Sequence, residues 1–247
     1  MLLKYIIPYI RDYGSLDFIY SYLGTKERNK NIENNQFRRF VLNDDKKGLW
    51  VCFLPWNISF ESASKLNLIP KKKKVIVYEM PCGIINPVPK LSKKIMLNIV
   101  ADLKNNIDLE QKFSVMGLSI GIYPAFYVAN HFNVDKLVIL APGAYLGESL
   151  WEGVATQEVK RRAVNQGCLT FKEYDKEIRG TNPIENLDDL PKDIEIYIST
   201  NDNFIKTKFG EKVINKLNEK EKNPVVKYFK GKGHVLGLVE FGLKNNY

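Results

Sequence analysis

The sequence predicts an α/β fold with a mainly parallel central sheet and helices on both of its faces. Near-continuous apolar runs at 75–81, 113–118 and 136–142 have the composition of strands that are buried on both sides. Stretches of 10–15 residues with helical spacing lie between such runs. Strands that alternate with helices of this length are typical of parallel sheets.

The elements that precede the first of these strands are of two kinds. Residues 1–24 have the pattern of an amphipathic helix, with aromatic side chains among polar ones, and a polar loop follows. The segments 37–42 and 49–55 are rich in strand formers and flank the turn-rich sequence NDDKKG. They therefore predict a β-hairpin.

The remaining elements follow in regular alternation. Apolar residues recur every four positions in 91–107, which predicts a helix, and 119–132 is also predicted to be helical because Pro124 falls near its first turn. After an insertion at about 145–190 we expect, in order, a strand at 194–200, a helix at 209–221, a strand at 225–229 and a helix at about 235–244.

Length and composition favour one folded unit. The chain has 247 residues, of which 45% are hydrophobic and 26% charged, as in ordinary globular proteins. It contains no internal repeat and no low-complexity linker. We expect a single domain over residues 1–247, with a helical lid inserted at about 145–190.

Cysteine content and hydropathy favour a cytoplasmic protein. The three cysteines, Cys52, Cys82 and Cys168, are too few and too widely spaced for a disulfide framework or a thiolate metal cluster. No apolar stretch approaches the roughly 20 residues that cross a bilayer. The apolar run between Lys4 and Arg11 is shorter than the apolar part of a signal peptide, about 7–15 residues. We therefore expect neither secretion nor a transmembrane segment.

The net charge of +9 does not by itself predict a nucleic-acid partner. Thirty of the 37 basic residues are lysine, whereas nucleic-acid-binding surfaces favour arginine and concentrate their charge. The dense run at 71–74 directly precedes a strand, where charged side chains are solvated. No nucleic-acid partner is expected, although a basic protein that binds nucleic acid or an acidic surface remains an alternative.

A Gly-x-Ser-x-Gly motif, Gly117 to Gly121, lies between a predicted strand and a predicted helix. A nucleophile at such a junction sits on a turn so tight that a Cβ two residues away on either side would collide with neighbouring backbone. Glycines at both places remove that conflict. Ser119 is therefore the candidate nucleophile, above the sheet and at the N-terminus of a helix, which favours developing negative charge.

A serine nucleophile needs a base, and the chain has two histidines. His131 lies twelve residues after Ser119 on the same predicted helix, about 18 Å away, so we assign it no chemistry. His234 lies in a glycine-rich loop after a strand, where functional residues gather in α/β sheets. Asp202 follows the preceding strand and is the candidate carboxylate that orients the imidazole.

The motif GLSIG after a buried strand, with the chain order Ser119, Asp202, His234, resembles the α/β-hydrolase superfamily. The resemblance extends from about residue 36 to the end of the chain. It implies the α/β-hydrolase fold, with seven or eight strands, an antiparallel edge and a helical lid in the insertion. This fold carries esterases, thioesterases, peptidases and acyltransferases, so the resemblance does not select among them.

The expected oxyanion loop departs from the family pattern. Many members have a His-Gly pair after the strand that corresponds to 49–53, whereas this chain has Leu54-Pro55-Trp56-Asn57. Proline has no N–H, so the donors we expect are the backbone N–H groups of Ile120 and of Trp56, with Asn57 as an alternative to Trp56.

The first half of the insertion has a broad apolar face at helical spacing, from Leu146 to Ala163. We expect it to form one helix that packs over the sheet. Leu150, Trp151 and Val154 are the candidate lining of an acyl-binding pocket above Ser119. The pattern fits an aliphatic and an aromatic acyl group equally well.

These observations predict a serine hydrolase that cleaves carboxylic ester or thioester bonds of a small molecule through an acyl-enzyme. No metal or organic cofactor is expected, because two histidines without a metal-binding spacing give little material for a zinc site. Acyl transfer on the same fold and a non-catalytic ligand-binding protein remain alternatives. The sequence does not predict the oligomeric state.

Overall fold

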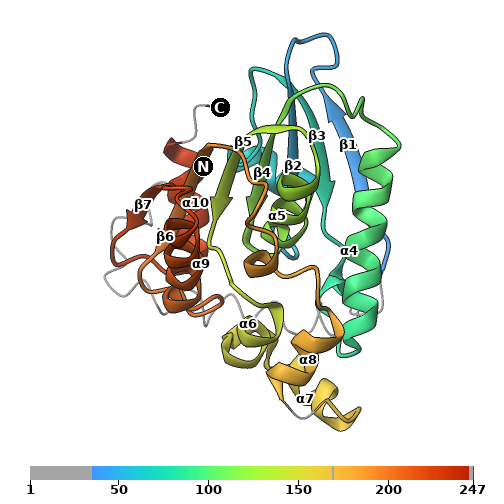
Figure 1. Cartoon of the computed structure of the whole chain (residues 1–247), viewed down its shortest axis with the longest axis vertical. Coiled ribbons are helices and arrows are strands. Elements are labelled where there is room, and N and C mark those ends of the chain that lie inside the picture. The colour runs from blue at the N-terminus through green and yellow to red at the C-terminus, as the bar shows by residue number, and fades with distance from the viewer. Residues whose placement is uncertain (1–34, 169, 245–246) are drawn as a thin grey trace.

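The computed structural model describes residues 35–168, 170–244 and 247, and at its centre is a seven-stranded sheet (Figure 1). The strands are β1 (Arg38–Leu42), β2 (Leu49–Phe53), β3 (Lys74–Glu79), β4 (Phe113–Leu118), β5 (Val134–Leu140), β6 (Asp193–Ser199) and β7 (Val225–Phe229). Their order across the sheet is β1-β3-β2-β4-β5-β6-β7. All neighbouring pairs are parallel except β1 with β3. The predicted α/β class and mainly parallel sheet are confirmed, with an antiparallel strand at one edge.

Helices cover both faces of the sheet. They are α3 (Phe60–Lys65), α4 (Pro89–Lys104), α5 (Ile122–His131), α6 (Leu146–Glu152), α7 (Gln157–Asn165), α8 (Phe171–Glu177), α9 (Thr207–Glu219) and α10 (His234–Lys244). Apolar residues of α4, α5 and α9 pack on one face, and those of α3 and α10 pack on the other. Within β2, Val51 faces the first group of helices and Cys52 the second, as the alternation of side chains along a strand requires. The predicted N-terminal helix and the polar loop after it lie outside the described residues, except for the last residues before β1.

The predicted hairpin of 37–42 with 49–55 is wrong. β3 lies between the two strands, so that Ile76 pairs with Val41 on one side and with Val51 on the other. The four central residues of β3 are buried, which favours a position with a strand on each side. β1 is mostly exposed and takes the edge, where Arg38 binds Glu79 with a shortest N···O distance of 2.7 Å. The turn-rich segment therefore connects β1 to a strand that it does not pair with.

The expected single helix from Leu146 to Ala163 is interrupted at Gly153. The chain there is extended, and it separates α6 from the short 3-10 turn Val154–Thr156 and from α7. A Cβ on residue 153 would lie 2.4 Å from the carbonyl oxygen of Phe204. The next N–H, that of Val154, donates a hydrogen bond to the Asn203 carbonyl at 3.0 Å. Contact with the loop after β6 therefore replaces helical bonding at this point.

The sheet brings the carboxyl ends of strands that are distant in sequence to the same side of the molecule. Phe53 pairs with Gly117 at the ends of β2 and β4, and Ser199 pairs with Phe229 at the ends of β6 and β7. Because these strands are parallel, the loops that follow them emerge on the same side. Figure 1 shows α6, α7 and α8 grouped beyond this end of the sheet.

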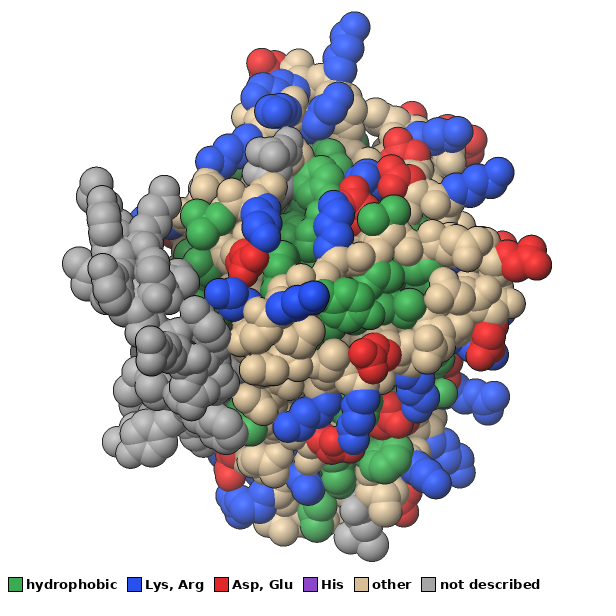
Figure 2. Space-filling view, turned by 90° about the vertical axis from the view of Figure 1, so that its left-hand side faces the viewer, with side chains coloured by type: hydrophobic (Ala, Val, Ile, Leu, Met, Phe, Trp, Pro, Cys, Tyr) green, Lys and Arg blue, Asp and Glu red, His purple; other side chains and the backbone are tan. Residues whose placement is uncertain are grey.

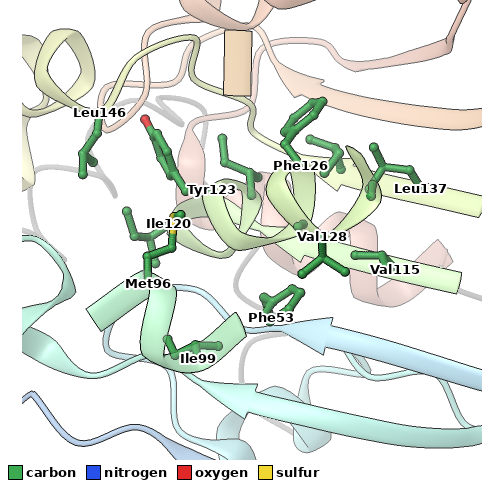
Figure 3. Packing of buried hydrophobic residues seen from close by; sticks show 14 of the residues in the cluster. Phe53, Met96, Ile99, Val115, Ile120, Tyr123, Phe126, Val128, Leu137 and Leu146 are labelled. Atoms are coloured by element: carbon green, nitrogen blue, oxygen red, sulfur yellow. The ribbon is translucent and has the colours of Figure 1, made fainter. Parts of the chain in front are cut away.

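The core beneath the helices is dense and apolar. Figure 3 shows Ile120 beside Met96 of α4, and Tyr123 of α5 between Ile120 and Leu146 of α6. The start of α5 is therefore packed from two sides, against α4 and against the segment after β5. This packing holds the strand-to-helix junction in place.

Positive charge is dispersed on the face seen in Figure 2. Lysine and arginine side chains are spread over that face with acidic side chains among them. Several of the protein's lysines are paired with carboxylates: Lys136 with Glu195 at 2.6 Å and Lys212 with Glu148 at 2.9 Å, for example.

None of the helices in the described ranges combines the length and the apolar character needed to cross a lipid bilayer.

Candidate active site

Ser119 occupies a strained turn between β4 and α5. β4 ends at Leu118, a 3-10 turn covers Ser119–Gly121, and α5 begins at Ile122. The φ angle of Ser119 is 54°, in the left-handed region that non-glycine residues rarely adopt. Strain of this kind persists only where surrounding packing enforces it, and it is often found at functional sites.

Both glycines of the motif are required because other parts of the chain approach their Cα atoms too closely for a side chain. A Cβ on Gly117 would lie 2.5 Å from the Cβ of Ala125, one turn into α5. A Cβ on Gly121 would lie 2.2 Å from the carbonyl oxygen of Phe53 at the end of β2. The crowding expected from the spacing of the motif is therefore present, with the helix on one side and a neighbouring strand on the other.

A chain of two hydrogen bonds joins the three side chains singled out from the sequence. His234 Nε2 lies 2.8 Å from Ser119 Oγ, and His234 Nδ1 lies 2.7 Å from Asp202 Oδ2. With Nδ1–H donating to the carboxylate, the imidazole presents Nε2 as an acceptor for the serine hydroxyl. All three residues are buried, at 7% exposure or less. An ionised carboxylate in such surroundings needs hydrogen-bond partners on both of its oxygens.

The second oxygen of Asp202 is held by backbone. Oδ1 accepts hydrogen bonds from the N–H groups of Phe204 and Ile205, both at 2.8 Å. These bonds fix the carboxylate at the turn after β6, so that its other oxygen faces the imidazole. Aspartate is suited to this position because its short side chain can bind its own backbone two and three residues further on.

The loop that precedes His234 is attached to the loop that carries Asp202. Gly231 N–H donates to Thr200 Oγ1 at 2.8 Å, and Asn201 N–H donates to the Lys232 carbonyl at 2.9 Å. His234 itself is the first residue of α10, rather than part of the preceding loop as the sequence indicated. Rigid attachment of both loops keeps the imidazole in register with the carboxylate.

Phe204 is a neighbour of the imidazole that the sequence reading missed. Its ring stacks on that of His234, with centroids 4.9 Å apart and an interplanar angle of 20°. The only signal in the sequence is its position two residues after Asp202. The stacking covers one face of the imidazole and limits its rotation.

The other histidine has no part in this cluster. His131 is the last residue of α5, is exposed, and stacks on Tyr127 with ring centroids 4.2 Å apart. Its Nδ1 lies 2.8 Å from the Tyr127 carbonyl. Among the residues that the structure describes, no group of three or more His, Cys, Asp or Glu side chains is placed to hold a metal ion.

Trp56 and Ile120 both line the space above Ser119. The indole Nε1–H of Trp56 donates to the Cys82 carbonyl at 3.0 Å, and the Cys82 thiol donates to Asn57 Oδ1 at 2.9 Å. Asn57 has a φ of 57°, which asparagine tolerates better than most residues. The loop after β2 is therefore fastened to the turn at Cys82–Ile84 by two side chains.

A cavity of about 360 Å³ opens directly above Ser119 and His234. Its walls come from six parts of the chain: the loop after β2 with the end of α3, the residue after the turn Cys82–Ile84, the start of α5, the α6 region, the loop after β6, and α10. Leu150 lines it, as expected from the sequence, together with Leu146 and Ala155. The contribution of α10, which places residues one, two, four and five positions after His234 in the wall, was missed.

Trp151 and Val154, the other two residues expected in the pocket, are placed differently. Trp151 packs edge-on against Tyr174 of α8, with ring centroids 5.8 Å apart, and is not among the lining residues. Val154 follows the break at Gly153 and is half-buried, also outside the lining. Trp151 precedes the break and is directed toward α8 by its own position in α6, one residue after Leu150. The interruption at Gly153 affects only the residues after it, and it brings Ala155 and Thr156 to the cavity in place of Val154.

A second carboxyl group, that of Asp175, is half-buried near the wall of the cavity. Asp175 Oδ1 on α8 accepts a hydrogen bond at 2.7 Å from the N–H of Gly147, in the first turn of α6. Burial raises the pKa of Asp175 to about 7, and the nearby carboxylates of Glu148 and Glu185 contribute in the same direction, against the backbone hydrogen bonds that lower it. Asp175 therefore joins α8 to the segment that carries Leu146 and Leu150.

The order of the strands, the strained serine after β4 and the position of the helices define the α/β-hydrolase fold. No model of a known protein family matches the sequence, and no curated protein matches it significantly. Solved structures of low sequence identity match the fold. An α/β hydrolase, MGS-M2, from a Medee basin deep-sea metagenome library matches at a TM-score of 0.53 and 13% identity, covering 85% of this chain and 95% of that one.

Two further matches are proteins of different activity. The capsule O-acetyltransferase of Neisseria meningitidis serogroup A matches at a TM-score of 0.59 and 15% identity, covering 86% of this chain and 90% of that chain. The Pyrococcus horikoshii acylaminoacyl peptidase matches at 0.55 and 12% identity, covering 87% of this chain. The match spans only 41% of the peptidase chain. These similarities establish the fold, which is shared by several kinds of acyl chemistry.

Proposed function

We propose that the protein is a serine hydrolase that cleaves carboxylic ester or thioester bonds of small molecules. The observation that carries the proposal is the continuous chain of hydrogen bonds from Asp202 through His234 to Ser119. The same three groups, in this arrangement, activate serine nucleophiles on unrelated folds. The open space directly above the hydroxyl provides room for a substrate carbonyl.

In the proposed mechanism, Ser119 Oγ attacks the carbonyl carbon while its proton passes to His234 Nε2. The C–O or C–S bond to the leaving group then breaks, and the leaving group takes that proton from His234. A water molecule attacks the acyl-enzyme, gives a proton to His234, and releases the carboxylic acid as Ser119 recovers its proton. Asp202 keeps the imidazole oriented and stabilises its positive charge in both halves.

The negative charge that develops on the carbonyl oxygen needs donors. We propose the backbone N–H groups of Ile120 and Trp56, two residues that line the space above Ser119. Each such donor is typically worth about 3 kcal/mol of transition-state stabilisation. No cofactor or metal enters the mechanism. The helices at 145–190 are proposed to act as a lid, because Leu146, Leu150 and Ala155 form part of the wall above Ser119.

Labelling with a fluorophosphonate probe tests the proposal, because the probe reacts with activated serines. We expect labelling of the wild type and none of Ser119→Ala or His234→Ala. Matched controls are Ser64→Ala and His131→Ala, which change an exposed serine and the other histidine. Hydrolysis of p-nitrophenyl esters and acyl thioesters should fall about 10³-fold or more in the first pair and stay unchanged in the second. A folded wild type that neither labels nor hydrolyses would instead favour a ligand-binding protein.

Acyl transfer to an alcohol or amine is the second candidate. It is favoured by the match to an O-acetyltransferase over 90% of that protein's chain. The two activities differ only in what attacks the acyl-enzyme. Product analysis in the presence of an added alcohol separates them, since a transferase yields mostly the new ester while a hydrolase yields mostly the acid.

For its setting, we propose a cytoplasmic protein. The three cysteines lie in the described part of the chain, where no disulfide joins them. We propose no nucleic-acid partner, because the basic side chains seen in Figure 2 are interspersed with acidic ones. Retention on DNA at 50 mM salt would contradict this, since non-specific binding is strongest at low salt.

A further inference from the structure

The cavity above Ser119 is walled by hydrocarbon. On the side of α3 and α10 its wall includes Ile58, Leu66 and Leu238, and on the side of α6 it includes Ile85, Leu146 and Leu150. Apart from His234, which belongs to the hydrogen-bonded cluster with Ser119, none of the described residues that line it carries a charged group or a side-chain amide. A substrate charge or peptide group placed there would lose its water without gaining a partner, which costs several kcal/mol.

The hydroxyl groups in the wall are already committed to the protein. Thr156 donates to the Leu150 carbonyl at 2.7 Å, and Ser149 donates to the Tyr145 carbonyl at 3.0 Å. Tyr123 donates to Ser149 Oγ at 3.4 Å, and burial raises the pKa of its phenol, which keeps it neutral. A hydroxyl has one hydrogen to donate, so none of these three can donate to a carbonyl, carboxylate or phosphate of the substrate.

We infer that the acyl part of the substrate is an uncharged aliphatic chain of medium length. This inference rests on the proposed function and narrows it, because it excludes acetyl, dicarboxylic and peptide acyl groups as preferred substrates. The size follows from volume: a dry protein cavity of about 150 Å³ holds benzene, so one of about 360 Å³ accommodates on the order of a dozen non-hydrogen atoms. With the reacting carbonyl and its ester oxygen included, the chain has roughly six to ten carbons.

The first test is a series of p-nitrophenyl esters from acetyl to palmitoyl on the wild type. We expect kcat/KM to rise by up to about fourfold for each added methylene as far as the octanoyl to decanoyl esters, and then to stop rising. The sharpest comparison is between the octanoyl ester and the half-ester of the eight-carbon dicarboxylic acid. The chains are matched in length, and the added carboxylate should lower kcat/KM by about 100-fold or more. Equal rates for that pair, or acetyl or benzoyl ahead of octanoyl, would overturn the inference.

A variant tests whether this cavity is the site that determines the preferred length of the acyl chain. Ala155→Leu adds three carbons to the wall and should lower the ratio of octanoyl to acetyl kcat/KM by about tenfold. Ala101→Leu is the matched control, because Ala101 is exposed on α4, a helix that contributes no residue to the cavity wall. A ratio that is the same in both variants would overturn the inference. The wild-type ester series decides the question even where Ala155→Leu fails to fold.

Failure of the inference and failure of the proposed function give different results. Ser119-dependent hydrolysis without a chain-length preference would retain the hydrolase and remove the aliphatic substrate. Absence of any Ser119-dependent hydrolysis would remove the hydrolase. Calorimetric titration with octanamide and acetamide then tests the cavity by itself, since the amide binds without reacting. Tighter binding of octanamide by at least tenfold would support an aliphatic occupant, and equal binding would overturn it.

Discussion

Gly121 packs so closely against Phe53 that a Cβ on the glycine would lie 2.2 Å from the phenylalanine carbonyl oxygen. This contact joins the turn that carries Ser119 to the end of β2, and therefore to the loop that carries Trp56. The nucleophile and one proposed oxyanion donor are placed relative to each other by this backbone approach. No side chain larger than hydrogen can occupy position 121 without moving one of them.

The first prediction follows from the close contact between Gly121 and the backbone of Phe53. Gly121→Ala should destabilise the protein by about 1–3 kcal/mol, because the new methyl group meets backbone that cannot rotate away. It should also lower kcat for ester hydrolysis by 100-fold or more through displacement of Ser119. Thermal unfolding and kcat are the measurements.

Gly180→Ala serves as the comparison for Gly121→Ala. Gly180 has a φ of 88°, but a Cβ there would meet nothing within 4 Å. The variant should lose only about 1–2 kcal/mol from the backbone conformation and retain its kcat. Equal catalytic losses in the two variants would show that general destabilisation, rather than the contact with Phe53, governs activity.

The second prediction concerns the charge of Asp202. Asp202→Asn retains an oxygen that can accept the hydrogen bonds from Phe204 and Ile205 but removes the negative charge beside His234. We expect kcat to fall about 10³- to 10⁴-fold, with the unfolding temperature changed by only a few degrees. Asp189→Asn, at an exposed carboxyl, should leave both quantities unchanged. Activity within tenfold of wild type in Asp202→Asn would contradict the role proposed for this residue.

The third prediction is a pH dependence of stability that originates at Asp175. Its pKa in the folded protein, about 7, is above its ordinary value of 3.8, so the folded state binds more protons than the unfolded state between these values. Stability from this group is therefore present at low pH and is lost as pH rises from about 4 to 7. The loss amounts to at most about 4 kcal/mol.

Asp175→Asn should remove that dependence, because the amide stays neutral and its oxygen can still accept the hydrogen bond from Gly147. The variant should be more stable than the wild type at pH 8 and similar to it at about pH 3.5, below both pKa values of Asp175, as measured by urea unfolding. The opposite result would be a wild type that becomes more stable between pH 5 and pH 8 and an Asp175→Asn variant that does not. It would show that the pKa of Asp175 is lowered, rather than raised, in the folded protein.

The fourth prediction concerns the fastening of the Trp56 loop. Cys82→Ala removes the hydrogen bond from the thiol to Asn57 and should lower kcat by about tenfold with KM changed less than twofold, since a donor to the transition state is displaced. Cys82→Ser restores a donor and should recover most of kcat. Cys168→Ala, at another half-buried cysteine, is the control. A change confined to KM would indicate that the loop contacts substrate rather than supporting the oxyanion.

Local pattern was sufficient for most of the elements. β4 and β7 begin and end at the predicted residues, and the ends of α4, α9 and α10 differ from the prediction by at most three residues. Buried positions recur every two residues in a strand and about every 3.6 residues in a helix, so the spacing of apolar residues in the sequence indicates which element forms. The short helix α3 was missed, because six residues, FESASK, carry too little periodicity to be recognised.

The sequence by itself determined that the chain alternates strands and helices, that a serine stands on a glycine-flanked turn, and that one histidine and one aspartate follow it after later strands. Only the tertiary structure decided that β3 separates β1 from β2, that the helix after Leu146 breaks at Gly153, and that α10 rather than Trp151 walls the cavity. The physical reason is the same in each case. The local hydrophobic pattern of a segment indicates its secondary structure and which of its side chains are buried. It does not indicate which distant segment packs against them, because that depends on the contacts available when the whole chain folds.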